Sequence, residues 1–321
     1  MLKKLSKAAL RAAALAAVTV LTITSAPASA ASAPLGDART TVHFDLAEGQ
    51  LPENVALAPG GAAYVTFATA RQIARISPSG ATRILATLPA PADGGGHTPA
   101  MGSPLTTGIV RAHDGTLYVL YATGTADLTG LWRLRPGGTP QRIAALPADG
   151  LPNGLALDPD SHTLYITDSV LGTIWSVPTG GGVPTAWSTA PELAPAGFLG
   201  ANGLKVHGGA VWATNLDRGT VLRVPILGDG RAGSVRTVAT GLAGIDDFAF
   251  TGRGDQLLAA LNGPSEVALV QPGGAHSVVL GAADGLRNPT SVALRGDTVY
   301  VLSAAYVTGT DPNLTLARLN R

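Results

Sequence analysis

Cysteine is absent from this sequence of 321 residues, and charged residues make up only 13% of it. A chain without cysteine forms no disulfides, so its stability has to come from burial of apolar side chains. Its 22 basic and 21 acidic residues nearly balance, which argues against a nucleic-acid partner. Beyond the N-terminal segment no stretch has the periodicity of a long amphipathic helix. The whole sequence is rich in glycine and proline, with 41 and 23 residues, which is typical of many short strands joined by turns.

Motifs of several familiar chemistries are also missing. There is no G-x-S-x-G elbow, so a serine-hydrolase mechanism has little support. No histidine pair has the H-x-H or H-E-x-x-H spacing of a zinc site, and no cysteine is present to replace it. The six histidines are His43, His97, His113, His162, His207 and His276. A zinc centre is therefore not expected.

The sequence contains six copies of one strand-turn-strand pattern, spaced about 45 to 55 residues apart. The clearest copy is residues 151–177, in which apolar strands alternate with turns rich in glycine and aspartate. Repeats of this length and composition predict an all-β fold, a six-bladed β-propeller. The segment 39–47 also alternates, and as an N-terminal strand it is predicted to join the last blade and close the ring. We expect residues 31–321 to form this single propeller domain.

Residues 1–30 look like a secretory signal peptide. Lys3, Lys4, Lys7 and Arg11 precede an apolar run, and the sequence Ala-Pro-Ala-Ser-Ala ends at Ala30. This pattern predicts cleavage after Ala30 and a secreted, extracellular protein without a membrane span in the mature chain. We further expect a monomer.

A polar residue begins the first strand of every repeat: Glu53, Thr107, Asn153, Asn202, Asp246 and Thr290. The innermost strands of a propeller all start at one rim of the central channel, so these side chains should converge there. Two carboxylates and two amides would then offer the hard oxygen ligands that Ca²⁺ prefers. The alternative is that they cap the inner strands and bind channel water.

Three segments resemble the senescence marker protein/gluconolactonase/luciferin-regenerating enzyme family of six-bladed propellers. They are ENVAL from Glu53, LPNGLALDPD with LYITDS in residues 151–169, and ANGLKV with VWATN in residues 201–215. Short propeller repeats also resemble NHL-type and strictosidine-synthase-like proteins. The first resemblance implies a divalent metal at the channel mouth, held by Glu53, Asn153 and the residue at position 202.

This chain departs from that family in two places. Asn202 stands where the family has an aspartate, which removes a metal ligand and a general base. Pro104 to Gly108 lacks the Arg and the Asn-Asp-Gly of the sugar-lactone enzymes. Asp246 could supply the missing carboxylate from the fifth blade. The hypothesis is a site for Ca²⁺ or another divalent cation formed by Glu53, Asn153, Asn202 and Asp246, with Asp247 as a spare ligand.

The predicted function is that of a metal-dependent lactonase or esterase acting on a small molecule at the channel mouth. Asp246 or Glu53 would transfer the proton, while Asn153 and Asn202 orient substrate and metal. A different class of function remains open, in which the propeller is a non-catalytic platform for a small ligand or a protein. A strictosidine-synthase-like enzyme would require a late catalytic glutamate, and Glu266, the only candidate, is predicted to lie inside a strand.

Overall fold

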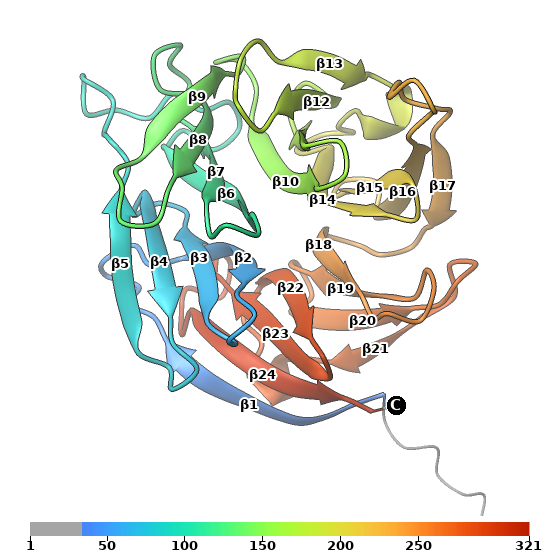
Figure 1. Cartoon of the computed structure of the whole chain (residues 1–321). Helices are drawn as coiled ribbons and strands as arrows, with labels where there is room; N and C mark the ends of the chain where they lie inside the picture. The colour runs from blue at the N-terminus through green and yellow to red at the C-terminus, as the bar shows by residue number, and fades with distance from the viewer. Residues whose placement is uncertain (1–33, 321) are drawn as a thin grey trace, which may run out of the picture. The chain divides into compact units, whose positions relative to one another are not determined.

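The computed structural model describes residues 34–320, which contain 24 β-strands in six four-stranded antiparallel sheets. The sheets lie around a central axis as the blades of a propeller (Figure 1). Two three-residue 3-10 helices, η1 (Pro191–Leu193) and η2 (Ala282–Asp284), lie in loops. The predicted six-bladed β-propeller is therefore confirmed. The predicted signal peptide, residues 1–30, lies outside the described residues.

The first three blades follow one another along the chain, each built from the channel outward. Blade 1 contains β2 (Pro52–Leu57), β3 (Ala63–Phe67), β4 (Gln72–Ile76) and β5 (Thr82–Thr87). Blade 2 contains β6 (Leu105–Arg111), β7 (Leu117–Ala122), β8 (Gly130–Leu134) and β9 (Gln141–Ala145). Blade 3 contains β10 (Pro152–Asp158), β11 (Thr163–Asp168), β12 (Thr173–Pro178) and β13 (Thr185–Ser188).

The next two blades repeat this order, and the last combines both ends of the described chain. Blade 4 contains β14 (Ala201–His207), β15 (Ala210–Asn215), β16 (Thr220–Pro225) and β17 (Arg236–Ala239). Blade 5 contains β18 (Ile245–Phe250), β19 (Leu257–Leu261), β20 (Glu266–Val270) and β21 (His276–Leu280). Blade 6 contains β22 (Pro289–Arg295), β23 (Thr298–Ser303), β24 (Asn313–Leu319) and β1 (Leu35–His43).

Strand β1 pairs antiparallel with β24 and is the outermost strand of blade 6. It begins and ends earlier than the alternating segment 39–47 chosen from the sequence. The chain turns after His43 because the Asp45 carboxylate accepts hydrogen bonds from the backbone N–H groups of Ala47 and Glu48. Such a side-chain-to-backbone turn competes with strand pairing.

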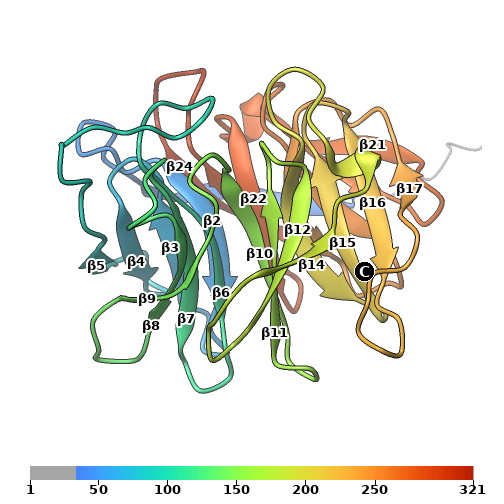
Figure 2. The ribbon, with the colours of Figure 1, turned by 90° about the horizontal axis from the view of Figure 1, so that it is seen from above.

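The hydrophobic core lies between adjacent blades. Val65 and Phe67 of β3 pack with Leu302 of β23, and Leu258 of β19 packs with Val301 of β23. These side chains are fully buried because the strands alternate between two faces that are both covered by neighbouring blades. The inner strands β2, β6, β10, β14, β18 and β22 contact one another around the channel (Figures 1 and 2). The fold thereby brings the starts of all six inner strands to one face.

Within residues 34–320, no helix has the length and apolar character needed to cross a membrane.

Candidate functional site

Every inner strand begins with a local irregularity at its predicted polar residue. The pairing between the inner strand and its neighbour skips Glu53 in blade 1, Asn153 in blade 3 and Asp246 in blade 5. The same break occurs at Thr107, Asn202 and Thr290 in the other blades. A bulge leaves a residue out of the ladder and re-aims its side chain. All six side chains are buried at the channel end where the inner strands start.

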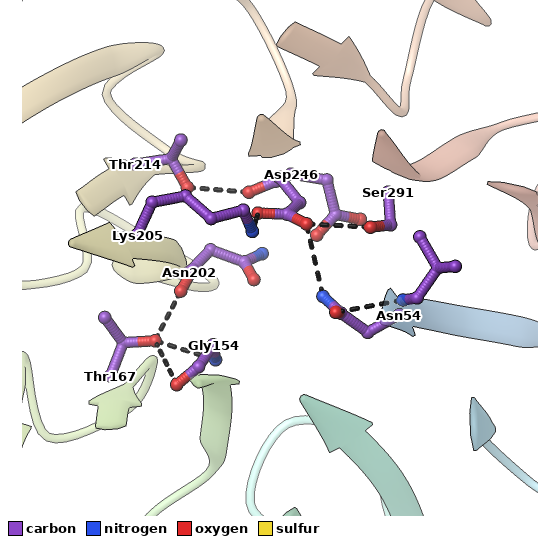
Figure 3. A network of polar contacts seen from close by, with 10 residues as sticks. Asn54, Gly154, Thr167, Asn202, Lys205, Thr214, Asp246 and Ser291 are labelled. Carbon is purple, nitrogen blue, oxygen red and sulfur yellow. Dashed lines mark hydrogen bonds and ion pairs between the residues drawn. The ribbon is translucent and has the colours of Figure 1, made fainter. Parts of the chain in front are cut away.

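Threonines of the second strands hold the polar residues of the following blade in place. The hydroxyl of Thr214 donates to the backbone oxygen of Asp246 at 2.6 Å, and that of Thr66 donates to the oxygen of Thr107 at 2.7 Å. Thr167 donates in the same way to the backbone oxygen of Asn202 (Figure 3). These buried hydrogen bonds connect successive blades at the candidate site residues.

Two glycines that follow site residues allow the blades to approach this closely. A Cβ atom added to Gly203 would lie 2.6 Å from the backbone oxygen of Asp246. A Cβ atom on Gly108 would lie 2.5 Å from the backbone oxygen of Asn153. Neither distance is possible for a real side chain, so glycine is needed for close backbone approach. This explains why a glycine follows the polar residue in Thr107-Gly108 and Asn202-Gly203.

Five of the six predicted residues line one cavity of about 350 Å³ at this end of the channel: Glu53, Thr107, Asn153, Asn202 and Asp246. Thr290 does not line it; its hydroxyl instead donates to the backbone oxygen of Pro52 at 2.9 Å. The structure thus brings together all four residues of the proposed cation site. Glu266 is the first residue of β20, which is the third strand of blade 5, and it does not line the cavity.

Glu53 is a buried carboxylate with one strong hydrogen bond. The phenol of Tyr306, in the loop after β23, donates to its Oε2 at 2.5 Å. Burial raises the pKa of Glu53 from 4.5 to about 7, and the charge of Asp247 adds to this, while the hydrogen bond from Tyr306 opposes it. Burial of the Tyr306 phenol raises its pKa well above 10, and the charge of Glu53 raises it further. Glu53 therefore changes protonation state near neutral pH.

Asp246 is the second buried carboxylate of the cavity. Burial raises its pKa well above the usual value, and the charges of Glu53 and Asp247 raise it further. Hydrogen bonds from the amides of Asn202 and Asn262 act in the opposite direction; the Asn262 Nδ2 atom lies 3.4 Å from Asp246 Oδ2. Two carboxylates that resist ionisation together form an arrangement that a cation would stabilise.

Asn153 has a fixed side-chain orientation. Its Nδ2 donates to Ser169 Oγ at 3.2 Å, and Ser169 in turn donates to the backbone oxygen of Ala201 at 2.7 Å. With its nitrogen engaged by Ser169, the amide has its oxygen as the atom available for coordination.

The side chains that line the cavity limit the kind of metal ion that it can hold. No three side chains of His, Cys, Asp or Glu come together within residues 34–320 in a way that could hold a metal ion. A cation at this cavity would therefore depend on two carboxylates together with the amide oxygens of Asn153 and Asn202. This all-oxygen set with two negative charges fits Ca²⁺, which accepts amide and carboxylate oxygens in flexible geometry.

Asp247 does not act as the spare ligand that was expected, so this prediction was wrong. Its carboxylate, 2% exposed, forms an ion pair with Lys205 at 2.6 Å and accepts hydrogen bonds from Ser291 at 2.7 Å and Asn54 at 3.3 Å. Asp246 lines the cavity, whereas Asp247 does not, because Lys205, Ser291 and Asn54 hold its carboxylate. Lys205 and Asn54 line a second cavity of about 500 Å³, formed by later residues of the inner strands.

Sequence reasoning missed Tyr306 and Asn262, which both lie just after the second strand of a blade. The second strand is antiparallel to the inner strand, so its end lies beside the inner strand's start. A search for polar residues after each second strand would have found both. It would also have found Ser169, which follows β11.

The segment Pro104 to Gly108, which contains no arginine, borders the cavity. Leu105 and Thr107 are the residues that the segment Pro104 to Gly108 contributes to the lining. No lysine or arginine lines this cavity in the described part of the chain.

No family model matches the sequence, and a comparison with curated proteins finds no match either. Solved structures do resemble it. A proposed gluconolactonase aligns with a TM-score of 0.64 at 15% identity, over 89% of this chain and 92% of the other. A luciferin-regenerating enzyme aligns with a TM-score of 0.64 at 14% identity, over 88% and 95%.

A calcium-binding protein, regucalcin from Agrobacterium tumefaciens, aligns with a TM-score of 0.62 at 17% identity, over 87% of this chain and 95% of the other. The likeness is one of fold. Structural neighbours thus include the group that the sequence motifs resemble, but a propeller at this identity hosts many unrelated activities.

Proposed function

We propose that this protein is a metal-dependent hydrolase of lactones or esters that acts at the cavity around Glu53. The observation that carries the proposal is the pair of buried carboxylates, Glu53 and Asp246, at the base of a cavity that also contains Asn153 and Asn202. The fold shared with a gluconolactonase-type protein and with regucalcin supports it.

The proposed cation is Ca²⁺ or another divalent ion, held by Glu53, Asn153, Asn202 and Asp246. When bound, such an ion would neutralise the two carboxylates and polarise the substrate carbonyl. The neutral amides at positions 153 and 202 bind and orient without adding charge. The loss of the family's aspartate at position 202 is compensated in this proposal by Asp246 from the next blade.

Hydrolysis of a lactone requires a proton to leave the attacking water and a proton to reach the ring oxygen. Glu53 and Asp246 are the two carboxyl groups of the cavity lining that are available to carry these protons. Asp246, from β18 of blade 5, is the alternative proton acceptor. Tyr306 holds the Glu53 carboxylate in one orientation.

The first test is thermal unfolding of chelator-stripped protein with Ca²⁺, Mg²⁺, Mn²⁺ or Zn²⁺ added. A specific ion should stabilise the protein by about 2.7 kcal/mol at a hundredfold excess over its Kd. The double variant Glu53→Gln/Asp246→Asn should lose this response. The matched control Glu48→Gln/Asp160→Asn changes two exposed carboxylates and should keep it. An equal response in both variants would place the ion elsewhere.

The second test is turnover of lactones and esters by the protein loaded with the stabilising ion. Hydrolysis that is lost in the Glu53→Gln/Asp246→Asn variant supports the proposal. Stabilisation by a cation without any hydrolysis would instead favour the second candidate function, a binding platform. The neutral amide at position 202 is the observation that favours this alternative.

We also propose that the protein is secreted as a monomer after removal of residues 1–30. The basic and apolar pattern that ends at Ala30 supports this. Expression of the full chain should yield a protein outside the cell whose first residue is Ala31. Retention of the intact N-terminus in the cell would contradict secretion, and light scattering of the purified protein would test the monomer.

A further inference from the structure

The cavity around Glu53 has apolar walls above a polar base. Leu105, Leu151, Leu199 and Leu216 line its sides. The first three belong to one buried cluster, against which Leu216 packs. The base is formed by Glu53, Asn153, Asn202 and Asp246 at the starts of inner strands, and Leu151 and Leu199 precede two of these strands.

Exposed apolar side chains from three separate loops surround the opening. Met101 lies before β6, Phe198 before β14 and Val307 after β23, and all three line the cavity. Their exposed fractions are 36%, 49% and 77%. Large apolar side chains that remain exposed around a cavity are typical of a surface that binds an apolar ligand.

The charges of the cavity restrict the ligand further. The base contains two carboxylates, and no lysine or arginine lines the cavity within the described residues. An anionic ligand would therefore have no cationic side chain to bind. A ligand with many hydroxyl groups would place some of them against leucine, where they lose hydrogen bonds to water without replacement.

We propose that the substrates are neutral lactones or esters that carry an alkyl or aryl group, rather than sugar lactones. The carbonyl lies at the base near Glu53 and Asp246, and the apolar group lies between the leucines and Phe198. A cavity of about 350 Å³ is large enough for one such small molecule. This inference rests on the proposed hydrolase function and specifies its substrate class.

The test is a homologous series of γ-lactones, from γ-butyrolactone to γ-decanolactone, compared with glucono-δ-lactone. Each buried methylene should raise kcat/KM about threefold to fourfold until the cavity is filled. Glucono-δ-lactone should be hydrolysed more slowly than the longer γ-lactones. Hydrolysis of glucono-δ-lactone at an equal or higher rate, without dependence on chain length, would overturn the inference and leave the hydrolase function standing.

The variant Phe198→Ser tests the apolar wall directly. It should lower kcat/KM for γ-decanolactone about tenfold and lower that for γ-butyrolactone much less, which reduces the dependence on chain length. Its control is Val183→Ser in the loop between β12 and β13, where the valine is 88% exposed and does not line the cavity. An equal loss for both lactones in Phe198→Ser would contradict an apolar binding role.

Binding of 2-alkyltetrahydrofurans, from 2-methyl to 2-hexyl, separates the two proposals, because these cyclic ethers cannot be hydrolysed. Binding that strengthens with the length of the alkyl chain, in a protein that hydrolyses no lactone or ester, would support the apolar ligand class and refute the hydrolase. Hydrolysis of short and long lactones without binding of the ethers would refute the apolar ligand class. Absence of both binding and hydrolysis would refute both.

Discussion

The phenol of Tyr306 donates a hydrogen bond of 2.5 Å to Glu53, which lies 253 residues away in the sequence. The two residues come from the last and the first blade, which are neighbours because the ring is closed. Glu53 is buried, so this bond stabilises a carboxylate that has lost its contact with water.

Tyr306→Phe should destabilise the chelator-stripped protein by about 1–3 kcal/mol at pH 8, because the ionised Glu53 loses a hydrogen bond. The effect should be smaller at pH 5, where Glu53 is protonated. Urea unfolding at both pH values measures it. Tyr118→Phe is the control, since Tyr118 donates to the neutral backbone oxygen of Thr179 and should give the same change at both pH values. A pH-independent effect of Tyr306→Phe would contradict the assignment.

The stability of the chelator-stripped protein should fall as the pH rises from about 4.5 to 7. Glu53 has a pKa of about 7 in the folded protein and 4.5 as its ordinary value, and the pKa of Asp246 is raised as well. The folded state therefore binds protons more tightly than the unfolded state, and stability decreases until these groups are ionised. Glu53→Gln should reduce this slope. Identical slopes for the wild type and Glu53→Gln, measured by urea unfolding from pH 4.5 to 8, would show that Glu53 is not the group responsible.

Gly203→Ala should destabilise the protein by about 1–3 kcal/mol or more, since its Cβ would lie 2.6 Å from the backbone oxygen of Asp246. The displaced strand should also weaken the response to the stabilising cation. Gly228→Ala, where a Cβ meets no atom within 4 Å, is the matched control and should leave both properties nearly unchanged. Thermal unfolding with and without the cation measures both. An unaffected Gly203→Ala would mean that blades 4 and 5 tolerate a wider separation.

Lys205→Met should destabilise the protein by about 3 kcal/mol, because it leaves the buried Asp247 carboxylate without its cation. The double variant Lys205→Met/Asp247→Asn should recover much of this loss, since it removes the unpaired charge as well. Urea unfolding of the two variants and of Asp247→Asn alone completes a double-mutant cycle. A destabilisation of the double variant that equals the sum of the two single variants would show that the ion pair contributes little.

Much of the fold could be predicted because each blade repeats a local pattern of strands and turns. The polar residue at the start of each inner strand was also recognisable, and Glu53, Asn153, Asn202 and Asp246 do line one cavity. Their use as a cation site remains a prediction. Thr290 looked equivalent in sequence, yet it points into a hydrogen bond with Pro52 rather than into the cavity.

The sequence alone determined the six repeats, the antiparallel strands and the rim at which polar residues gather, because these follow from local periodicity and turn chemistry. Tertiary structure decided which of two neighbouring aspartates faces the cavity, and that Tyr306 reaches Glu53. It also decided that the walls beside the carboxylates consist of leucines. These relationships join residues from different blades across the closed ring, and local sequence patterns contain no information about such distances.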